Sequence, residues 1–163
     1  TILFSGVMHS AARAAQAELA EHYDVAAELW SATSYKRLRE DALAVERLNR
    51  LHPSGPPQVP LVTGLLSESQ GPITAVSDFM KIVPEQIARF VPEGRPFHVL
   101  GTDGMGRSDT REALRRYFEI DTGHVVVSTL TGLLEQGDID ASVVEDAIRR
   151  YDIDPDAADP YLV

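Results

Sequence analysis

Residues 99–118 read VLGTDGMGRSDTREALRRYF, and this stretch joins an apolar strand to a helix through an exposed loop. The residues before the loop favour a strand: Phe97, Val99 and Leu100. Three glycines allow positive φ angles within the loop: Gly101, Gly104 and Gly106. Asp109, followed three residues later by Glu112, predicts a helix start of the capping-box type. Ligands and partner subunits meet open α/β sheets at the carboxyl ends of the strands, so we expect the functional surface near this loop.

The loop alone identifies no ligand. Its glycines do not follow the G-x-G-x-x-G spacing of dinucleotide sites, and the chain has no G-x-x-x-x-G-K-[ST] motif. We therefore favour a role in turn geometry and packing over direct contact with a small molecule. Complementary charges and a hydroxyl crowd into the same turn: Asp103, Arg107, Ser108 and Asp109. They hold the loop either to itself, which is the default interpretation, or to a second subunit.

Strand and helix patterns alternate along the chain. We expect strands over residues 2–5, 25–31, 73–77 and 97–102. We expect helices over residues 11–22, 35–49, 61–69, 84–91, 109–118, 124–136 and 141–151. This order implies a three-layer α/β/α sandwich with a mostly parallel sheet and right-handed crossovers. Residues 1–163 are expected to form a single domain, because a chain of this length buries one sizeable core.

Composition excludes several classes of protein. The net charge of −10 argues against a nucleic-acid partner, since phosphates are bound by neutralising them with Lys and Arg. No apolar run approaches the length of a membrane span, so we expect no membrane partner. The absence of cysteine excludes a disulfide scaffold and is compatible with a reducing compartment.

The sequence contains no recognisable catalytic motif. The five histidines are far apart in the sequence, and none forms an H-E-x-x-H pair or a similar metal motif. His9 is the exception worth following, because it comes after the first expected strand and so faces the same edge as Asp103. His9 is therefore a second candidate for a functional contact at this edge.

Four strings of the chain resemble, in the same order, segments of the homodimeric pyruvate dehydrogenases, the thiamine-diphosphate-dependent decarboxylating component of the pyruvate dehydrogenase complex. They lie at residues 25–38 (VAAELWSATSYKRL), 73–92 (ITAVSDFMKIVPEQIARFVP), 99–118 and 137–154 (GDIDASVVEDAIRRYDID). Transketolases resemble this region in fold but lack the G-T-D-G-x-G-R-S-D motif. Met105 departs from the family, in which an aromatic residue is usual.

The resemblance implies a transketolase C-terminal-like domain with a five-stranded, mainly parallel sheet. It also implies that thiamine diphosphate and Mg²⁺ are bound by two preceding domains, so no family catalytic, cofactor or metal residue transfers to this chain. The chain opens within a strand, and we take it to be a fragment without activity of its own. The implied partners are a second copy in a homodimer and a lipoyl-bearing acyltransferase, in the cytoplasm.

The expected role is therefore architectural, with the loop of residues 101–109 as the candidate interface. Two alternatives remain open at this point. In the first, the chain is an independent α/β domain that binds a small ligand near Gly6, Ser34 and Gly104. In the second, it is an interaction module that docks to a partner by its acidic surface.

Overall fold

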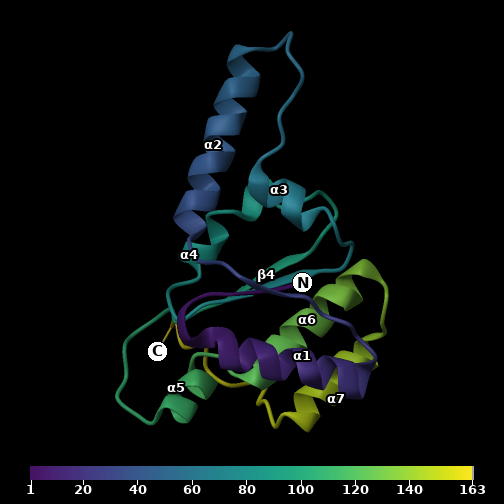
Figure 1. The fold of residues 1–163 in the computed structure, drawn as a ribbon. Coiled ribbons are helices and arrows are strands. Elements are labelled where there is room, and N and C mark those ends of the chain that lie inside the picture. Colours follow the sequence, from purple (N-terminus) through teal and green to yellow (C-terminus); the bar gives the residue numbers. More distant parts are fainter. Residues whose placement is uncertain (163) are drawn as a thin grey trace.

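The computed structural model describes residues 1–162, and a parallel sheet lies at its centre (Figure 1). The sheet order is β2-β1-β3-β4, with β1 at Ile2–Phe4, β2 at Leu29–Ser31, β3 at Ile73–Val76 and β4 at Phe97–Leu100. All three strand pairs are parallel, with Ile2 opposite Leu29 on one side and Thr74 on the other. The expected α/β class and parallel sheet are confirmed.

The expected number of strands is wrong. The described chain has a sheet of four strands, whereas the family resemblance implied five. After β4 every regular element is a helix: α5 (Arg111–Tyr117), α6 (Thr122–Gln136) and α7 (Ala141–Arg150). The segment that follows α7, residues 152–162, is rich in aspartate and proline and forms only turns. It lacks the apolar alternation that a further strand needs.

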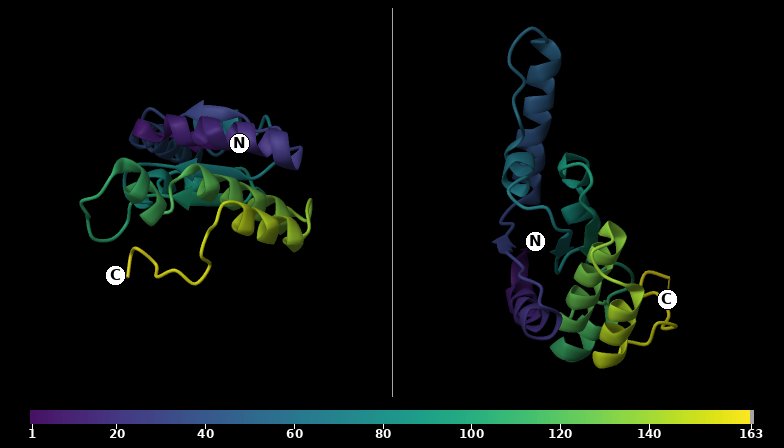
Figure 2. Two further views of the ribbon diagram at one scale, coloured as in Figure 1. Left: turned by 90° about the horizontal axis from the view of Figure 1, so that it is seen from below. Right: turned by 90° about the vertical axis from the view of Figure 1, so that its right-hand side faces the viewer.

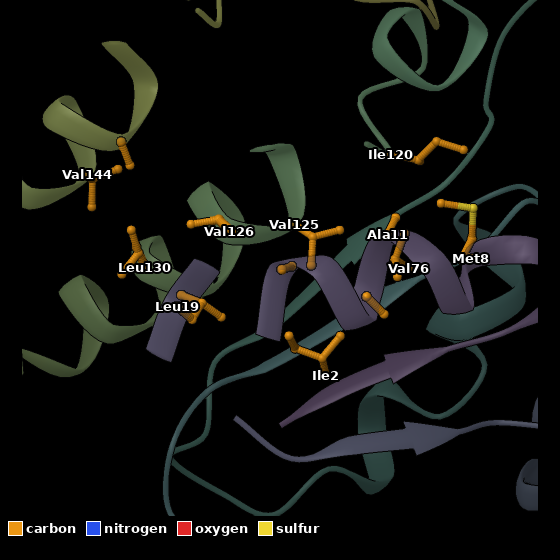
Figure 3. Packing of buried hydrophobic residues seen from close by; sticks show 13 residues of the cluster. Ile2, Met8, Ala11, Leu19, Val76, Ile120, Val125, Val126, Leu130 and Val144 are labelled. Atoms are coloured by element: carbon orange, nitrogen blue, oxygen red, sulfur yellow. The ribbon is translucent and has the colours of Figure 1, made fainter. Parts of the chain in front are cut away.

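Helices cover both faces of the sheet, which gives the chain a core on each side (Figure 2). On one face α1 (His9–Tyr23) and α6 pack over Ile2 and Val76, and α7 packs against α6, as Figure 3 shows. On the other face α2 (Tyr35–Leu51), α3 (Leu61–Leu66) and the turns α4 (Ile82–Glu85) and η2 (Ala88–Phe90) pack over Leu3 and Ala75. Neighbouring residues of a strand thus enter opposite cores, as the pleat requires.

Most helix boundaries follow the sequence pattern, with one clear departure. The single helix expected from Pro84 to Val91 is divided into α4 and η2. Bonds from Ile87 N to Pro84 O and from Phe90 N to Ile87 O have the tighter i to i+3 spacing. Pro92 also disfavours helical backbone at the residue before it, and Val91 is extended.

The helix α2 projects beyond the sheet, and residues 52–60 return alongside it (Figure 1). Ser34 caps its start, with Oγ accepting a hydrogen bond from Arg37 N at 3.2 Å. Asn49 holds the return segment through two bonds to the Gln58 backbone, at 2.8 and 2.9 Å. The proline-rich segment is therefore a connection within the domain.

Candidate functional site

The strand order reverses at β1, because β2 lies on one side of β1 and β3 on the other. The crevice outside the carboxyl ends of β1 and β3 is where open α/β sheets usually bind. Here two hydroxyls bridge the turns: Ser5 Oγ donates to Ser77 Oγ at 2.9 Å, and Ser77 Oγ accepts from Phe79 N at 3.1 Å. The turn after β1 is thereby fastened to the turn after β3.

Gly6 begins the short 3₁₀ turn η1 (Gly6–Met8) with a φ of +58°. A side chain there would overlap the Asp78 carboxylate, so the position requires glycine for both conformation and space. Asp78 Oδ1 is buried and has no hydrogen-bond partner among residues 1–162. The two turns therefore approach each other more closely than the sequence pattern indicates.

The three loop glycines have different roles. Gly104 alone has a positive φ, of +101°, and a Cβ there would overlap the Pro160 carbonyl. At Gly101 a Cβ would lie 2.6 Å from Phe79 O and 2.8 Å from Lys81 N, so this glycine serves close approach. Gly106 has neither property. The expectation that all three supply positive φ angles is wrong for two of them.

Polar contacts fasten the first part of the loop to its neighbours. Asp103 Oδ2 accepts a hydrogen bond from Lys81 N at 2.9 Å, and Thr102 Oγ1 donates to Asp78 O at 3.1 Å. The Arg107 guanidinium lies over the Tyr117 ring, 4.2 Å from its centroid, as a cation–π contact. The default interpretation of a turn that satisfies its own charges is therefore wrong for Asp103 and Arg107, whereas Asp109 bonds the backbone of the next residue.

The residues at the end of the loop shift the predicted helix start by one position. Thr110 caps α5, since its Oγ1 accepts from Ala113 N at 3.2 Å. Asp109 instead bonds the Thr110 backbone N at 2.6 Å, and Ser108 makes no side-chain hydrogen bond within residues 1–162. From α5, Arg115 donates to Val7 O and Ser10 Oγ, both at 3.2 Å, which ties the loop back to the turn after β1.

His9 lies at this edge, as expected, at the first position of α1. Its ring is exposed and meets the Phe4 ring edge-on, with centroids 5.5 Å apart. No acidic or nucleophilic side chain is bonded to it within the described chain. The geometry gives His9 a packing contact, and a functional contact stays a prediction.

We name the surface of residues 5–8, 77–82 and 101–115 the strand-end rim. Large apolar side chains project from it, each more than half exposed: Val7, Phe79, Met80, Ile82 and Met105. Tyr161 and Leu162, beside Gly104, are also exposed. The rim carries four basic and four acidic residues, so the rest of the chain holds the entire net charge of −10. Exposed apolar groups gathered on a neutral surface are typical of a binding face.

A partly buried ion cluster at the start of α6 was missed by the sequence analysis. Asp121 caps α6, and its Oδ1 accepts from His124 N at 3.0 Å and pairs with His124 Nδ1 at 2.7 Å. Arg116 Nη1 donates to Asp121 Oδ2 at 3.2 Å, and Arg116 also bonds the carbonyls of Tyr151 and Asp152. Burial alone would raise the pKa of Asp121, but these hydrogen bonds and the charge of His124 outweigh it and lower the pKa to about 2.

A metal-binding cluster and a membrane-spanning helix are both absent from the part of the chain that the structure describes. Within residues 1–162, no three His, Asp or Glu side chains gather in a way that suits a metal ion. In the same range no helix is both long and apolar enough to cross a membrane.

Comparison with known proteins gives a consistent result. A family model described as the transketolase-like TK C-terminal domain matches residues 1–121. Three proteins named pyruvate dehydrogenase E1 component are 49%, 43% and 42% identical to the chain, from Mycolicibacterium smegmatis, Pseudomonas aeruginosa and Escherichia coli K12. These matches cover 94%, 98% and 99% of the chain but 16%, 18% and 18% of the relatives. The chain thus spans less than a fifth of the length of the curated relatives it matches.

Proposed function

The chain belongs to the transketolase-like C-terminal domain family, and we propose that it serves as the C-terminal domain of a thiamine-diphosphate-dependent pyruvate dehydrogenase. Similarity to the E1 components along nearly the whole chain supports this proposal. In the full-length enzyme, pyruvate is decarboxylated and the acetyl group passes to a lipoyl group on an acyltransferase. We place this enzyme in the cytoplasm.

We propose that the residues of this chain do not themselves hold thiamine diphosphate with Mg²⁺. Such a magnesium ion takes carboxylate oxygens from the protein, and within residues 1–162 no three acidic or histidine side chains gather in a way that suits a metal ion. We therefore propose that other domains of the enzyme bind the cofactor. The contribution of this domain is then to hold the enzyme together.

The strand-end rim is the surface that we propose for this role, as the contact between two copies of the enzyme. A two-fold interface brings the same patch together from both copies, so the patch must complement itself. A rim with balanced charges and projecting Phe79, Met80 and Met105 side chains meets this requirement. The net charge of −10 lies wholly outside the rim, so the rim itself sets up no net repulsion between two copies.

The neutral apolar rim is the observation that carries the proposal, and Phe79→Glu in the full-length polypeptide tests it. A carboxylate buried in the interface is expected to raise the dimer dissociation constant at least about tenfold, measured by analytical ultracentrifugation. Val59→Glu is the matched control, because Val59 is as exposed as Phe79 but lies on the return segment beside α2. Equal dissociation constants for the two variants would overturn the role of the rim.

The enzymatic identity needs a separate measurement. The full-length polypeptide, supplied with thiamine diphosphate and Mg²⁺, is expected to release carbon dioxide from pyruvate and to acetylate a lipoyl domain. No turnover of pyruvate by a correctly folded dimer would contradict the identity while leaving the rim proposal intact.

A further inference from the structure

A cavity of about 240 Å³ lies on the α2 and α3 face of the sheet, and the proposed function makes no use of it. Its floor consists of buried aliphatic side chains from three elements: Leu3, Val62 and Ile87. The Trp30 side chain, at the sheet edge on β2, contributes a half-buried aromatic wall. The cavity is open to solvent at one side, and its inner part is lined by apolar side chains.

The volume fits a small molecule. An apolar protein cavity of roughly 150 Å³ is sufficient for a benzene molecule, so about 240 Å³ accommodates a ring with two or three further heavy atoms. A branched aliphatic chain of similar size fits equally well. The floor offers no hydrogen-bonding side chain, so this body must be apolar.

The mouth of the cavity is polar, in contrast to its apolar floor. Thr33 and Ser34 line it with hydroxyls, and Arg37 extends beside them from the first turn of α2. Arg37 shares the Glu40 carboxylate, at 3.2 Å, with Lys36, at 3.6 Å, so two cations face one anion. All three side chains are exposed, and such pairs are weak enough for Arg37 to turn toward a new partner.

Acidic residues are excluded from the lining of this cavity, although the chain has 25 acidic and 15 basic residues. The mouth therefore presents the Arg37 cation and two hydroxyls, and the acidic groups beside it are Glu40, which pairs with Arg37, and Glu28, which accepts a hydrogen bond from the Trp30 indole at 3.2 Å. An anionic group placed there gains a charge-assisted hydrogen bond from Arg37 while the attached apolar body leaves water.

We propose that this cavity binds a small carboxylate with an aromatic or branched aliphatic body, the carboxylate at Arg37 and the body against Trp30 and Val62. The binding does not depend on pyruvate turnover or on the rim. The site is therefore separate from the proposed function, and each stands or fails without the other.

Trp30 is the only tryptophan of the chain, so its fluorescence reports directly on the cavity. Phenylacetate is the probe, and phenethylamine, of similar shape but opposite charge, is the comparison. Titration of the 163-residue chain with phenylacetate is expected to change Trp30 fluorescence to saturation. Phenethylamine is expected to bind at least about tenfold more weakly, because Arg37 repels it.

Two variants separate the contributions of charge and space. Arg37→Gln is expected to raise the dissociation constant for phenylacetate about tenfold, as loss of one charge-assisted hydrogen bond implies. Arg39→Gln, an exposed arginine of the same helix outside the cavity, is the matched control and is expected to leave it unchanged. Val62→Phe fills the floor and is expected to abolish the saturable change.

Ala32→Leu, nearer the mouth and less buried than Val62, repeats the filling test if Val62→Phe unfolds the chain. Circular dichroism identifies the folded variants. The proposal is overturned if phenylacetate gives no saturable change, if phenethylamine binds as well, or if Arg37→Gln and Arg39→Gln behave alike. It is also overturned if a folded, filled variant still binds.

Discussion

Asp121→Asn removes one charge from the cluster that joins α5, α6 and the end of α7. Asparagine is also a good helix cap, so the variant isolates the loss of charge from the loss of the cap. The pKa of Asp121 falls from 3.8 to about 2 in the folded chain, and this shift corresponds to about 2 kcal/mol of stability at neutral pH. We expect Asp121→Asn to lower the free energy of unfolding by about this amount.

The pH dependence follows from the direction of the shift. Because the folded pKa lies below the unfolded one, the stabilisation is complete above about pH 4 and is lost as the pH falls toward 2. The wild-type chain should therefore lose more stability than Asp121→Asn across this range. Below the pKa of Asp121 in the folded chain, wild type and Asp121→Asn should have nearly the same free energy of unfolding.

Urea unfolding, followed by circular dichroism at neutral pH and at the lower end of this range, measures both effects. Asp138→Asn is the matched control, because Asp138 is exposed and its side chain forms no ion pair within the described chain. A loss below about 0.5 kcal/mol for Asp121→Asn at neutral pH, the scale of an ordinary surface substitution, would refute the reasoning. The same acid response in wild type and Asp121→Asn would refute it as well.

Three further substitutions test the packing of the loop and of α6. Gly104→Ala combines a strained φ with a clash at Pro160, so we expect a loss of about 2 kcal/mol and faster proteolysis of the C-terminal segment. Gly132→Ala should lower the free energy of unfolding by about 1–3 kcal/mol in thermal unfolding, because the new Cβ overlaps Pro72. Helix propensity alone would favour alanine here, so unchanged stability would contradict this packing. Arg107→Ala loses its stacking on Tyr117 and should weaken dimerisation of the full-length polypeptide in sedimentation experiments.

Local patterns in the sequence were enough to predict the layers of the fold. Strand β4 and the loop after it could be located from apolar residues followed by glycines, and the end of α6 from Gly137, whose φ is +80°. The sequence does not decide which residue caps α5, because Asp109 and Thr110 are both good capping residues. Only the observed extended backbone and hydroxyl contact of Thr110 distinguish them.

Contacts between distant segments were beyond prediction from local pattern. Gly101 requires glycine because Phe79 lies against it, and Gly104 because Pro160 does, and neither neighbour is close in sequence. The Asp121 and His124 pair, three residues apart before an apolar helical run, was a local signal that could have been used. The carbonyls that complete the cluster, at Tyr151 and Asp152, carry no sequence signal at all.

The reactivity of a thiol at the rim tests the proposed interface most directly. The chain has no cysteine, so Met105→Cys and Leu51→Cys each place one thiol in it, at exposed positions on the rim and at the end of α2. Alkylation is measured by mass spectrometry on the full-length dimer and on the dissociated protein. We expect dimerisation to protect the thiol at position 105 and to leave the one at position 51 reactive. Equal alkylation of both thiols in the dimer would contradict a rim that joins two copies.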